Sequence, residues 1–244
     1  MRFFEKLIAQ ALKEKDSSIE GIVLGWHASV VRLRDGRVGI GTVPPGDKIP
    51  LDTREEHTRH LLSSSAHGLV SLFASPYPQE FAVASAIVSA LVPASKCSLP
   101  LDSIAGIPEN DSVAVIGYDK ILIPHLRDWG WNMSILDNQR EAPDIFPEHA
   151  ASEKLPSCQW CWLTAEAFRN RWFTFIQPYI SHMKGIFLQG PGLPCLPSLF
   201  REAGITHLIL PTISPTEEMN VTQYISAGGH PMLCRDISWN VYFL

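Results

Sequence analysis

Glycine and acidic residues at the ends of two apolar runs are the first candidates for chemistry. Gly117 follows one run and precedes Tyr118 and Asp119, and Asp137 ends the next run twenty residues after Gly117. In dinucleotide-binding folds, an acidic residue at this spacing accepts hydrogen bonds from a ribose. The second and third glycines of that fingerprint are absent here, since Tyr, Asp, Lys and Ile follow Gly117. The pattern therefore indicates either a plain strand-to-helix turn or a looser site for an adenosine-type or other small ligand.

The second candidate is the glycine- and proline-rich segment 189–194, QGPGLP. Gly190 and Gly192 permit close backbone approach and exposed N–H groups, and Pro191 stiffens the loop. Successive N–H groups can bind an anion or a planar ligand. A rigid connection between two elements explains the same residues equally well. Thr164, at the end of another apolar run, is a further candidate at a strand end.

Pairs with the spacing of metal ligands are few. Cys158 and Cys161 have redox or zinc spacing, but a three-residue offset in a strand turns the sulfurs to opposite faces, and no second pair completes a tetrahedral site. His57 and His60 lie three residues apart on an expected helix, without an evident third ligand. We therefore expect inert cysteines and a solvated helix face.

Glu80 and His27 are the candidates in the first half of the chain. Glu80 begins an expected helix, where the macrodipole favours an ionised carboxylate. It is a candidate metal ligand, or a simple charge at a helix start. Imidazole and carboxylate groups together suit zinc, nickel or iron, but no cluster with ligand spacing identifies the metal.

The composition narrows the class of protein. The chain has 244 residues, 45% hydrophobic and 18% charged, with 20 Lys and Arg against 25 Asp and Glu. Its net charge of −5 lacks the basic excess that binds phosphate backbones, so we expect no nucleic-acid binding. Five scattered cysteines suit a reducing compartment. No secretory signal is expected at the start, and the uncharged stretch 81–94 is too short to span a membrane, so we expect a cytoplasmic protein.

The first half of the chain has the pattern of an α+β domain. An amphipathic helix begins near Phe4, and two β-rich runs, 22–33 and 37–43, flank the hairpin turn Asp35-Gly36. Three helices are expected next, at 53–62, 66–73 and 80–91, the first opened by a capping box at Thr53. We predict a domain over residues 1–95, followed by a linker over 96–110.

The second half, residues 111–244, alternates strands and helices. The strands are expected at 112–117, 133–137, 159–164, 185–189 and 207–211. Helices are expected at 121–129, 165–180 and 197–203. Short apolar strands joined by helices imply crossover connections, hence a Rossmann-like parallel sheet. In such a sheet, ligands bind beyond the carboxyl ends of the strands, where the first candidates lie.

Four segments of the chain together resemble a known family. They are GWHASVVRLRDGRVGIG, the helix at 80–91, VIGYDKILIPHLRDWGWNMSILD and GPGLPCLPSLF. In the same order they resemble proteins described as "putative heavy-metal chelation". The resemblance implies an enolase-N-terminal-like domain before a Rossmann-like domain, with the active site in the cleft between them. This chain departs from the family pattern at Ala84, at Ser89 and in the loop 164–170.

The leading hypothesis is a protein that binds a small anionic or metal-complexing ligand, such as a transition metal ion or metal complex, in that cleft. The expected ligand contacts are Gly117, Tyr118, Asp119, Asp137, Thr164, Gly190, Pro191, Gly192, Glu80 and His27. One alternative is a transferase or oxidoreductase that uses an adenosine-bearing cofactor. Another is a non-catalytic protein that presents Trp129, Trp131, Trp160, Trp162 and Trp172 to a partner. The sequence leaves open whether the protein catalyses a reaction and whether it forms a homo-oligomer.

Overall fold

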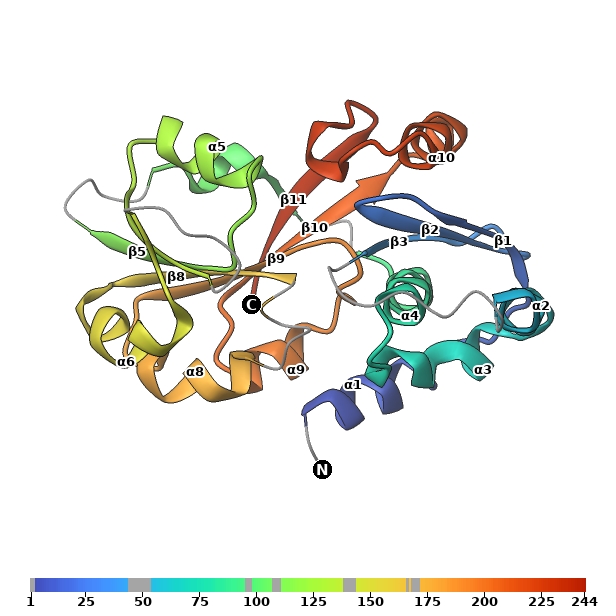
Figure 1. Cartoon of the computed structure of the whole chain (residues 1–244), viewed down its shortest axis with the longest axis horizontal. Coiled ribbons are helices and arrows are strands. Elements are labelled where there is room, and N and C mark those ends of the chain that lie inside the picture. The colour runs from blue at the N-terminus through green and yellow to red at the C-terminus, as the bar shows by residue number, and fades with distance from the viewer. Residues whose placement is uncertain are drawn as a thin grey trace. The chain divides into compact units, whose positions relative to one another are not determined.

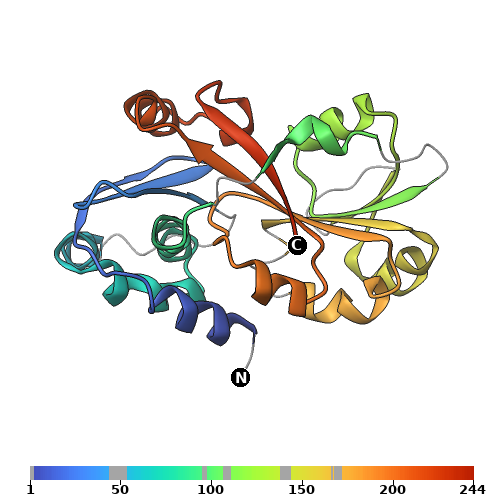
Figure 2. The same ribbon diagram turned by 180° about the vertical axis from the view of Figure 1, so that it is seen from behind.

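A computed structural model describes residues 3–43, 54–94, 98–106, 111–137, 144–165, 167 and 172–244. By packing, the chain divides into two units (Figures 1 and 2). Unit 1 contains Met1–Lys96, Pro191–Leu199 and Leu210–Ser238, and unit 2 contains Cys97–Gly190, Phe200–Ile209 and Trp239–Leu244. Two late segments, 191–199 and 210–238, thus pack with the first part of the chain. None of the helices in the described part has the length and apolar character that crossing a bilayer requires.

The sheet of unit 1 is a three-stranded antiparallel meander. It contains β1 (Ile19–Leu24), β2 (Ala28–Leu33) and β3 (Val38–Thr42), in that order. The single run expected at 22–33 is wrong in one respect, because it turns at 25–27 and forms two paired strands. A Cβ on Gly25 would lie 2.2 Å from the carbonyl oxygen of Ile225, so the turn depends on a tertiary contact as well as on local sequence.

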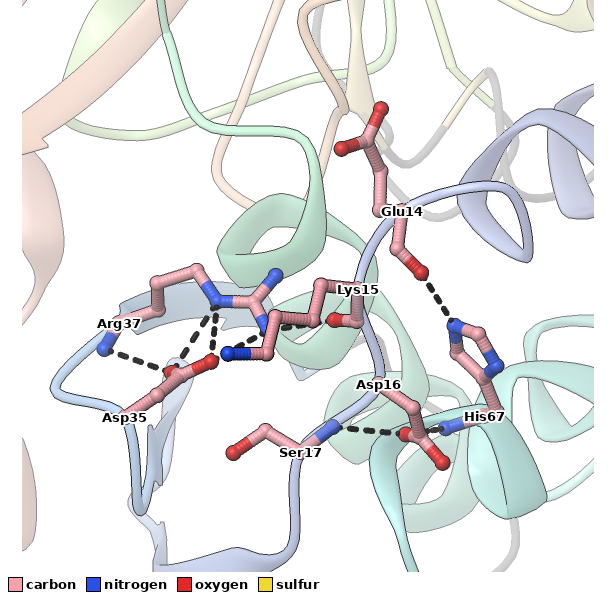
Figure 3. A network of polar contacts seen from close by, with 7 residues as sticks. All are labelled: Glu14, Lys15, Asp16, Ser17, Asp35, Arg37 and His67. Carbon is pink, nitrogen blue, oxygen red and sulfur yellow. Dashed lines mark hydrogen bonds and ion pairs between the residues drawn. The ribbon is translucent and has the colours of Figure 1, made fainter.

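The hairpin predicted at Asp35-Gly36 is confirmed, and a polar network supports it (Figure 3). Gly36 has a φ of 86°, which a glycine adopts without strain. The Arg37 guanidinium bonds the Asp35 carboxylate and donates to the carbonyl oxygen of Lys15 at 2.6 Å. The hydrogen bond from Arg37 holds the pKa of Asp35 below its ordinary value. In the same view, the amide of His67 donates to Asp16, so this network ties the segment after α1 to the hairpin and to α3.

Unit 1 also contains helices and 3-10 turns, some of which pack on its sheet. They are α1 (Phe3–Ala11), α2 (Arg54–Ser63), α3 (Ala66–Val70), the 3-10 turns η2 (Ser71–Ala74) and η6 (Pro231–Leu233), α4 (Pro78–Leu91) and α10 (Glu218–Ser226). The helix expected at 66–73 thus ends as a 3-10 turn, and the capping box at Thr53 lies outside the described residues. Helix α4 is buried on most sides and packs on β3. A Cβ on Gly39 would lie 1.9 Å from the carbonyl oxygen of Ala86, so glycine permits this close approach.

The second sheet has eight strands in the order β4-β11-β10-β9-β8-β5-β6-β7. The bounds are β4 (Leu99–Pro100), β5 (Ser112–Ile116), β6 (Asn132–Leu136), β7 (Ile145–Phe146), β8 (Trp160–Thr164), β9 (Gly185–Gln189), β10 (His207–Ile213) and β11 (Ile237–Phe243). The run from β10 to β7 is parallel, and β4 pairs antiparallel with β11. All five predicted strands are confirmed, whereas β4, β7 and β11 were not predicted. The parallel part of the sheet belongs largely to unit 2.

Helices lie on both faces of the parallel sheet (Figure 1). They are α5 (Leu122–Asp128), α6 (Ala151–Lys154), α8 (Trp172–Ile180) and α9 (Pro197–Glu202), with 3-10 turns η3 (Leu101–Ile104), η4 (Glu148–Ala150) and η5 (Leu155–Ser157). Helix α5 covers one face of the sheet, and α6 and α8 cover the other.

Aromatic residues form much of the core of unit 2. Trp162 is fully buried, and its ring lies 5.7 Å from that of Trp131 and 5.3 Å from that of Phe187. Its indole N–H donates to Gln189 Oε1 at 2.9 Å. The hypothesis that the tryptophans present a surface to a partner is therefore wrong for Trp131 and Trp162, because both are buried in the core.

Candidate functional site

The carboxyl ends of the parallel strands of unit 2 gather most of the predicted ligand contacts. Strands β6, β5, β8 and β9 are consecutive neighbours that run in parallel. Their ends therefore meet at one edge, which carries Asp137, Gly117, Thr164 and Gly190. We call this edge, together with Tyr118, Asp119 and Glu148, the carboxyl edge. This is where a parallel sheet places its ligands.

Gly117 and Thr164 contact each other at the carboxyl edge. Gly117 has a φ of 87°, and its amide donates to the carbonyl oxygen of Leu136 at 2.9 Å. A Cβ on Gly117 would lie 2.3 Å from Thr164 Oγ1, and the same hydroxyl donates to the carbonyl oxygen of Ile116 at 3.1 Å. Glycine is thus required here by its backbone conformation and by the neighbouring hydroxyl.

Asp137 supports the turn that follows β5. Its Oδ2 accepts a hydrogen bond from the amide of Tyr118 at 2.7 Å, and the residue is only 8% exposed. Asp137 therefore lies next to the Gly117 turn, as in folds that have the same twenty-residue spacing. The partner of this oxygen is the protein's own backbone, which the spacing alone does not reveal.

Asp119 occupies the start of α5. Its Oδ1 accepts hydrogen bonds from the amides of Ile121 at 2.7 Å and Leu122 at 3.0 Å. In dinucleotide-binding folds the pyrophosphate takes this position at the helix start. The Asp119 carboxylate accepts hydrogen bonds from the amides that would bind a phosphate, and its negative charge repels one. The geometry therefore does not favour a phosphate at this turn.

Glu148, in η4, is a member of the carboxyl edge that the sequence did not indicate. Burial raises the pKa of the Glu148 carboxyl above its ordinary value, and the negative charge of Asp137 raises it further. The negative charge of Asp137 therefore acts on the Glu148 carboxyl group. Sequence reasoning missed Glu148 because it follows β7, a two-residue strand without a recognisable pattern.

The amide of Gly190 is already used within the sheet. It donates to the carbonyl oxygen of Ile209 at 3.2 Å, which does not support its predicted role as a donor to an anion. The residue has a φ of 155°, and a Cβ there would lie 2.2 Å from the Cβ of Ala165. Close packing against Ala165 is thus a sufficient reason for a glycine at this position.

Pro191 and Gly192 belong to unit 1. The carbonyl oxygen of Pro191 accepts a hydrogen bond from Thr42 Oγ1 at 3.0 Å. Gly192 has a φ of 83°, and a Cβ there would lie 2.7 Å from Ser85 Cβ. This part of the loop fits closely against β3 and α4, which favours the structural explanation that the sequence left open.

Glu80 and His27 also lie in unit 1. Glu80, in the first turn of α4, accepts a short hydrogen bond from the Ser75 hydroxyl, and its Oε1 lies 3.5 Å from His57 Nδ1. The ring of His27 lies 5.2 Å from that of His230. His230 Nδ1 accepts a hydrogen bond from the amide of Met232 at 3.3 Å, so its proton lies on Nε2 and that nitrogen is not a ready metal ligand.

The cysteines and histidines do not form a metal centre in the described part of the chain, which holds no group of three or more His, Cys, Asp or Glu side chains placed to bind an ion. Cys158 and Cys161 are both buried, and burial raises the pKa of the Cys161 thiol. A thiol kept protonated is a poor metal ligand and a poor nucleophile, which does not favour either role for Cys161. His57 is half-buried and His60 is exposed, so these two histidines do not share an environment.

Two family profiles match the chain. Residues 99–244 match DUF364 and residues 4–92 match DUF4213, and the description of both reads "Putative heavy-metal chelation". None of the curated proteins is similar to the chain.

Two solved structures share the fold. A DUF364 protein of unknown function from Desulfitobacterium hafniense is 18% identical, with a TM-score of 0.77 over 99% of this chain and 98% of the other. One from Pyrococcus horikoshii, also of unknown function, is 15% identical, with a TM-score of 0.79 over the whole of both chains. The profile that covers residues 99–244 spans more than half of the sequence, and the chain therefore belongs to the DUF364 family.

Proposed function

We propose that the protein binds a small ligand that carries a metal ion at the carboxyl edge of unit 2, with Asp137 and Glu148 facing the positive charge. The observation that carries the proposal is the meeting of the ends of β5 and β6 at one edge, where Asp137 is buried and its negative charge acts on the Glu148 carboxyl. Two partly buried carboxylates repel each other, and a cation bound beside both removes the repulsion. The metal is cargo here, in keeping with the family description of heavy-metal chelation.

The donors of the carboxyl edge suit a metal complex better than a bare ion. The described residues hold no group of three side chains that could enclose an ion, and two carboxylates leave most coordination positions to other atoms. A small chelating ligand supplies those atoms. Of the anionic and metal-complexing ligands that the sequence allowed, the carboxylates at this edge favour the metal-complexing one.

The adenosine-cofactor hypothesis has less support. Asp137 lies beside the Gly117 turn as that hypothesis requires, but its Oδ2 is bonded to the Tyr118 amide. Asp119 holds the start of α5, where a phosphate would lie. Thermal shifts with S-adenosylmethionine and NAD test this alternative, and a rise in Tm with either ligand would restore it.

Several finer predictions of the sequence belong to the same proposal. The placement of the ligand in a cleft between the two halves, with contacts from Glu80, His27, Pro191 and Gly192, stays a prediction. The comparison of the first half with the enolase N-terminal domain also stays a prediction. Glu80→Gln and His27→Gln test these contacts separately from the residues of unit 2.

Isothermal titration with Zn²⁺ and Ni²⁺, alone and with a small carboxylate chelator such as citrate, tests the proposal. Asp137→Asn keeps an oxygen that can accept the Tyr118 amide, so the turn should hold while the charge is lost. We expect this variant and Glu148→Gln each to weaken metal-complex binding at least tenfold, or about 1.4 kcal/mol.

Glu153→Gln is the matched control. Its carboxylate lies on the adjacent helix α6, is 77% exposed and, among the described residues, pairs with Lys154 alone, so its loss should leave binding unchanged. Equal affinity in the wild type and both carboxyl-edge variants would refute the proposal.

A further inference from the structure

The turn that follows β5 is held from both of its neighbouring strands. The Thr164 hydroxyl, at the end of β8, donates to the carbonyl oxygen of Ile116 at 3.1 Å. On the other side of the same peptide group, the amide of Gly117 donates to the carbonyl oxygen of Leu136, at the end of β6, at 2.9 Å. The peptide group between Ile116 and Gly117 is therefore fixed at both of its polar atoms.

The next peptide group carries the amide that bonds Asp137. Gly117 has a φ of 87°, and this rotation turns the amide of Tyr118 toward the end of β6. The amide donates to Asp137 Oδ2 at 2.7 Å, a short distance that is typical of a charge-assisted hydrogen bond. The orientation of the Asp137 carboxylate therefore depends on the direction in which this amide points.

Thr164 also restricts Gly117 sterically. A Cβ on Gly117 would lie 2.3 Å from Thr164 Oγ1, and two more atoms of the Thr164 side chain lie 3.5 and 3.6 Å from the same position. The side chain of Thr164 thus packs against the Cα of Gly117, where the two peptide groups join. One side chain therefore bonds the first peptide group and limits the rotation that directs the second.

We propose that Thr164 is a positioning residue for Asp137, because it fixes the turn after β5 and this turn orients the carboxylate that faces the metal complex. The inference rests on the proposed function for its ligand, whereas the effect of Thr164 on the turn does not require a ligand. In metal sites, groups that orient a ligating side chain change the affinity although they do not touch the metal.

The other interpretation is that Thr164 only supplies a donor to the carbonyl group of Ile116, a buried residue. Thr206 offers a matched comparison, because its hydroxyl donates to the carbonyl oxygen of Ile186, also at 3.1 Å, where β9 and β10 begin. Loss of either hydroxyl should lower the melting temperature. A positioning role predicts that only the loss at Thr164 changes the Tyr118 amide and the binding of a metal complex.

Nuclear magnetic resonance of the full chain without ligand tests the effect on the turn. Thr164→Val has nearly the shape of threonine but no hydroxyl, and we expect its Tyr118 amide proton to shift upfield and to exchange faster with solvent than in the wild type. Asp137→Asn gives the shift that accompanies loss of the charge. Thr164→Ser keeps the hydroxyl and should restore the wild-type signal, and Thr206→Val should leave it unchanged.

Isothermal titration with the Zn²⁺–citrate complex tests the effect on binding. We expect Thr164→Val to weaken binding by about threefold to tenfold, less than the loss of about 10–100-fold that is typical of groups bonded directly to a metal-binding side chain. In an Asp137→Asn chain, Thr164→Val should cause no further loss, since it acts through that carboxylate. Thermal melts report whether each variant folds. If Thr164→Val does not fold, Thr164→Ala replaces it, because it leaves room for water at the Ile116 carbonyl.

Three results would overturn the proposal: a wild-type Tyr118 amide signal in the folded Thr164→Val chain, an equal change in Thr206→Val, or no restoration by Thr164→Ser. An altered amide with unchanged affinity for Zn²⁺–citrate would also overturn it, because the turn would then not position the carboxylate for the ligand. Failure of the wild type to bind any metal complex would refute the proposed function, and the amide measurements would still decide whether Thr164 positions Asp137.

Discussion

Replacing His207 with phenylalanine should flatten the dependence of stability on pH. His207 lies on β10, with its ring 4.5 Å from Phe187 and 4.7 Å from Phe243, and its Nδ1 is 2.7 Å from Thr206 Oγ1. Burial lowers the pKa of His207 from 6.5 to about 4. The folded protein therefore keeps a neutral imidazole at pH values where the unfolded chain carries a charged one.

Proton linkage gives the direction and the magnitude of the change in stability with pH. Between these two pKa values the unfolded state binds more protons than the folded state, so stability falls as the pH is lowered. For a pKa of 6.5 unfolded and about 4 folded, the loss between about pH 7.5 and about pH 5 is about 2 kcal/mol. The ring is only half-buried, and solvent screening reduces this to about 1 kcal/mol.

Urea unfolding of the wild type and His207→Phe at the two pH values measures the effect. The quantity of interest is the difference between the two pH-dependent changes, because other titrating groups and the lost Thr206 contact contribute almost equally at both pH values. We expect the wild type to lose about 1 kcal/mol more than the variant on acidification. Parallel changes in both proteins would show that His207 titrates normally in the folded state and would refute the argument.

Three further predictions concern backbone contacts and one ion pair. Gly117→Ala should lower the free energy of unfolding in urea more than Gly36→Ala does. Both glycines have a φ near 87°, but of the two only Gly117 has an atom within 4 Å of the added Cβ. Equal losses in the two variants would contradict this. Gly39→Ala should destabilise unit 1 by about 1–3 kcal/mol, the usual cost of overpacking a core. The Cβ added by Gly21→Ala meets nothing within 4 Å, so this variant should be neutral. A lower melting temperature for Gly21→Ala than for Gly39→Ala would refute this prediction. Hydrogen bonds from Lys184 and then Trp160 lower the pKa of Asp111. Asp111→Asn should therefore remove stability that is present above the ordinary carboxyl pKa and lost in acid. Thermal melts from about pH 7 to about pH 3 check this, and the same fall in Tm with acid in both proteins would contradict it.

Short sequence patterns predicted many of the secondary-structure elements of the fold. The Asp35-Gly36 turn predicted the β2–β3 hairpin because it needs a left-handed residue, and the structure has Gly36 at a φ of 86°. The five predicted strands of the second half have mainly apolar centres, with polar residues at or near their ends, which is typical of strands covered by helices on both faces. Strands β4 and β7 have two residues each, too short to leave a pattern.

Contacts distant in sequence explain what the sequence did not predict. The turn after β1 depends on Gly25 lying against Ile225, two hundred residues later. Likewise, segments 191–199 and 210–238 pack with the first part of the chain, although nothing in their composition separates them from their neighbours.

The sequence likewise predicted some features of the candidate site and not others. The spacing of Gly117 and Asp137 correctly placed them at one turn, since parallel neighbours bring their carboxyl ends together. The spacing did not reveal that the Asp137 carboxylate bonds the Tyr118 amide, or that Gly192 is a glycine because Ser85 lies against it. Burial and partners decide those roles, and neither follows from residue type.

The titration of the Glu148 carboxyl group tests the central claim most directly. Carbon-13 nuclear magnetic resonance of the full chain can follow this group with and without a Zn²⁺–citrate complex. Without metal we expect a pKa above the ordinary 4.5, because of burial and the charge of Asp137. A bound metal complex should bring the pKa below 4.5, whereas a titration that the complex leaves unchanged would contradict the account.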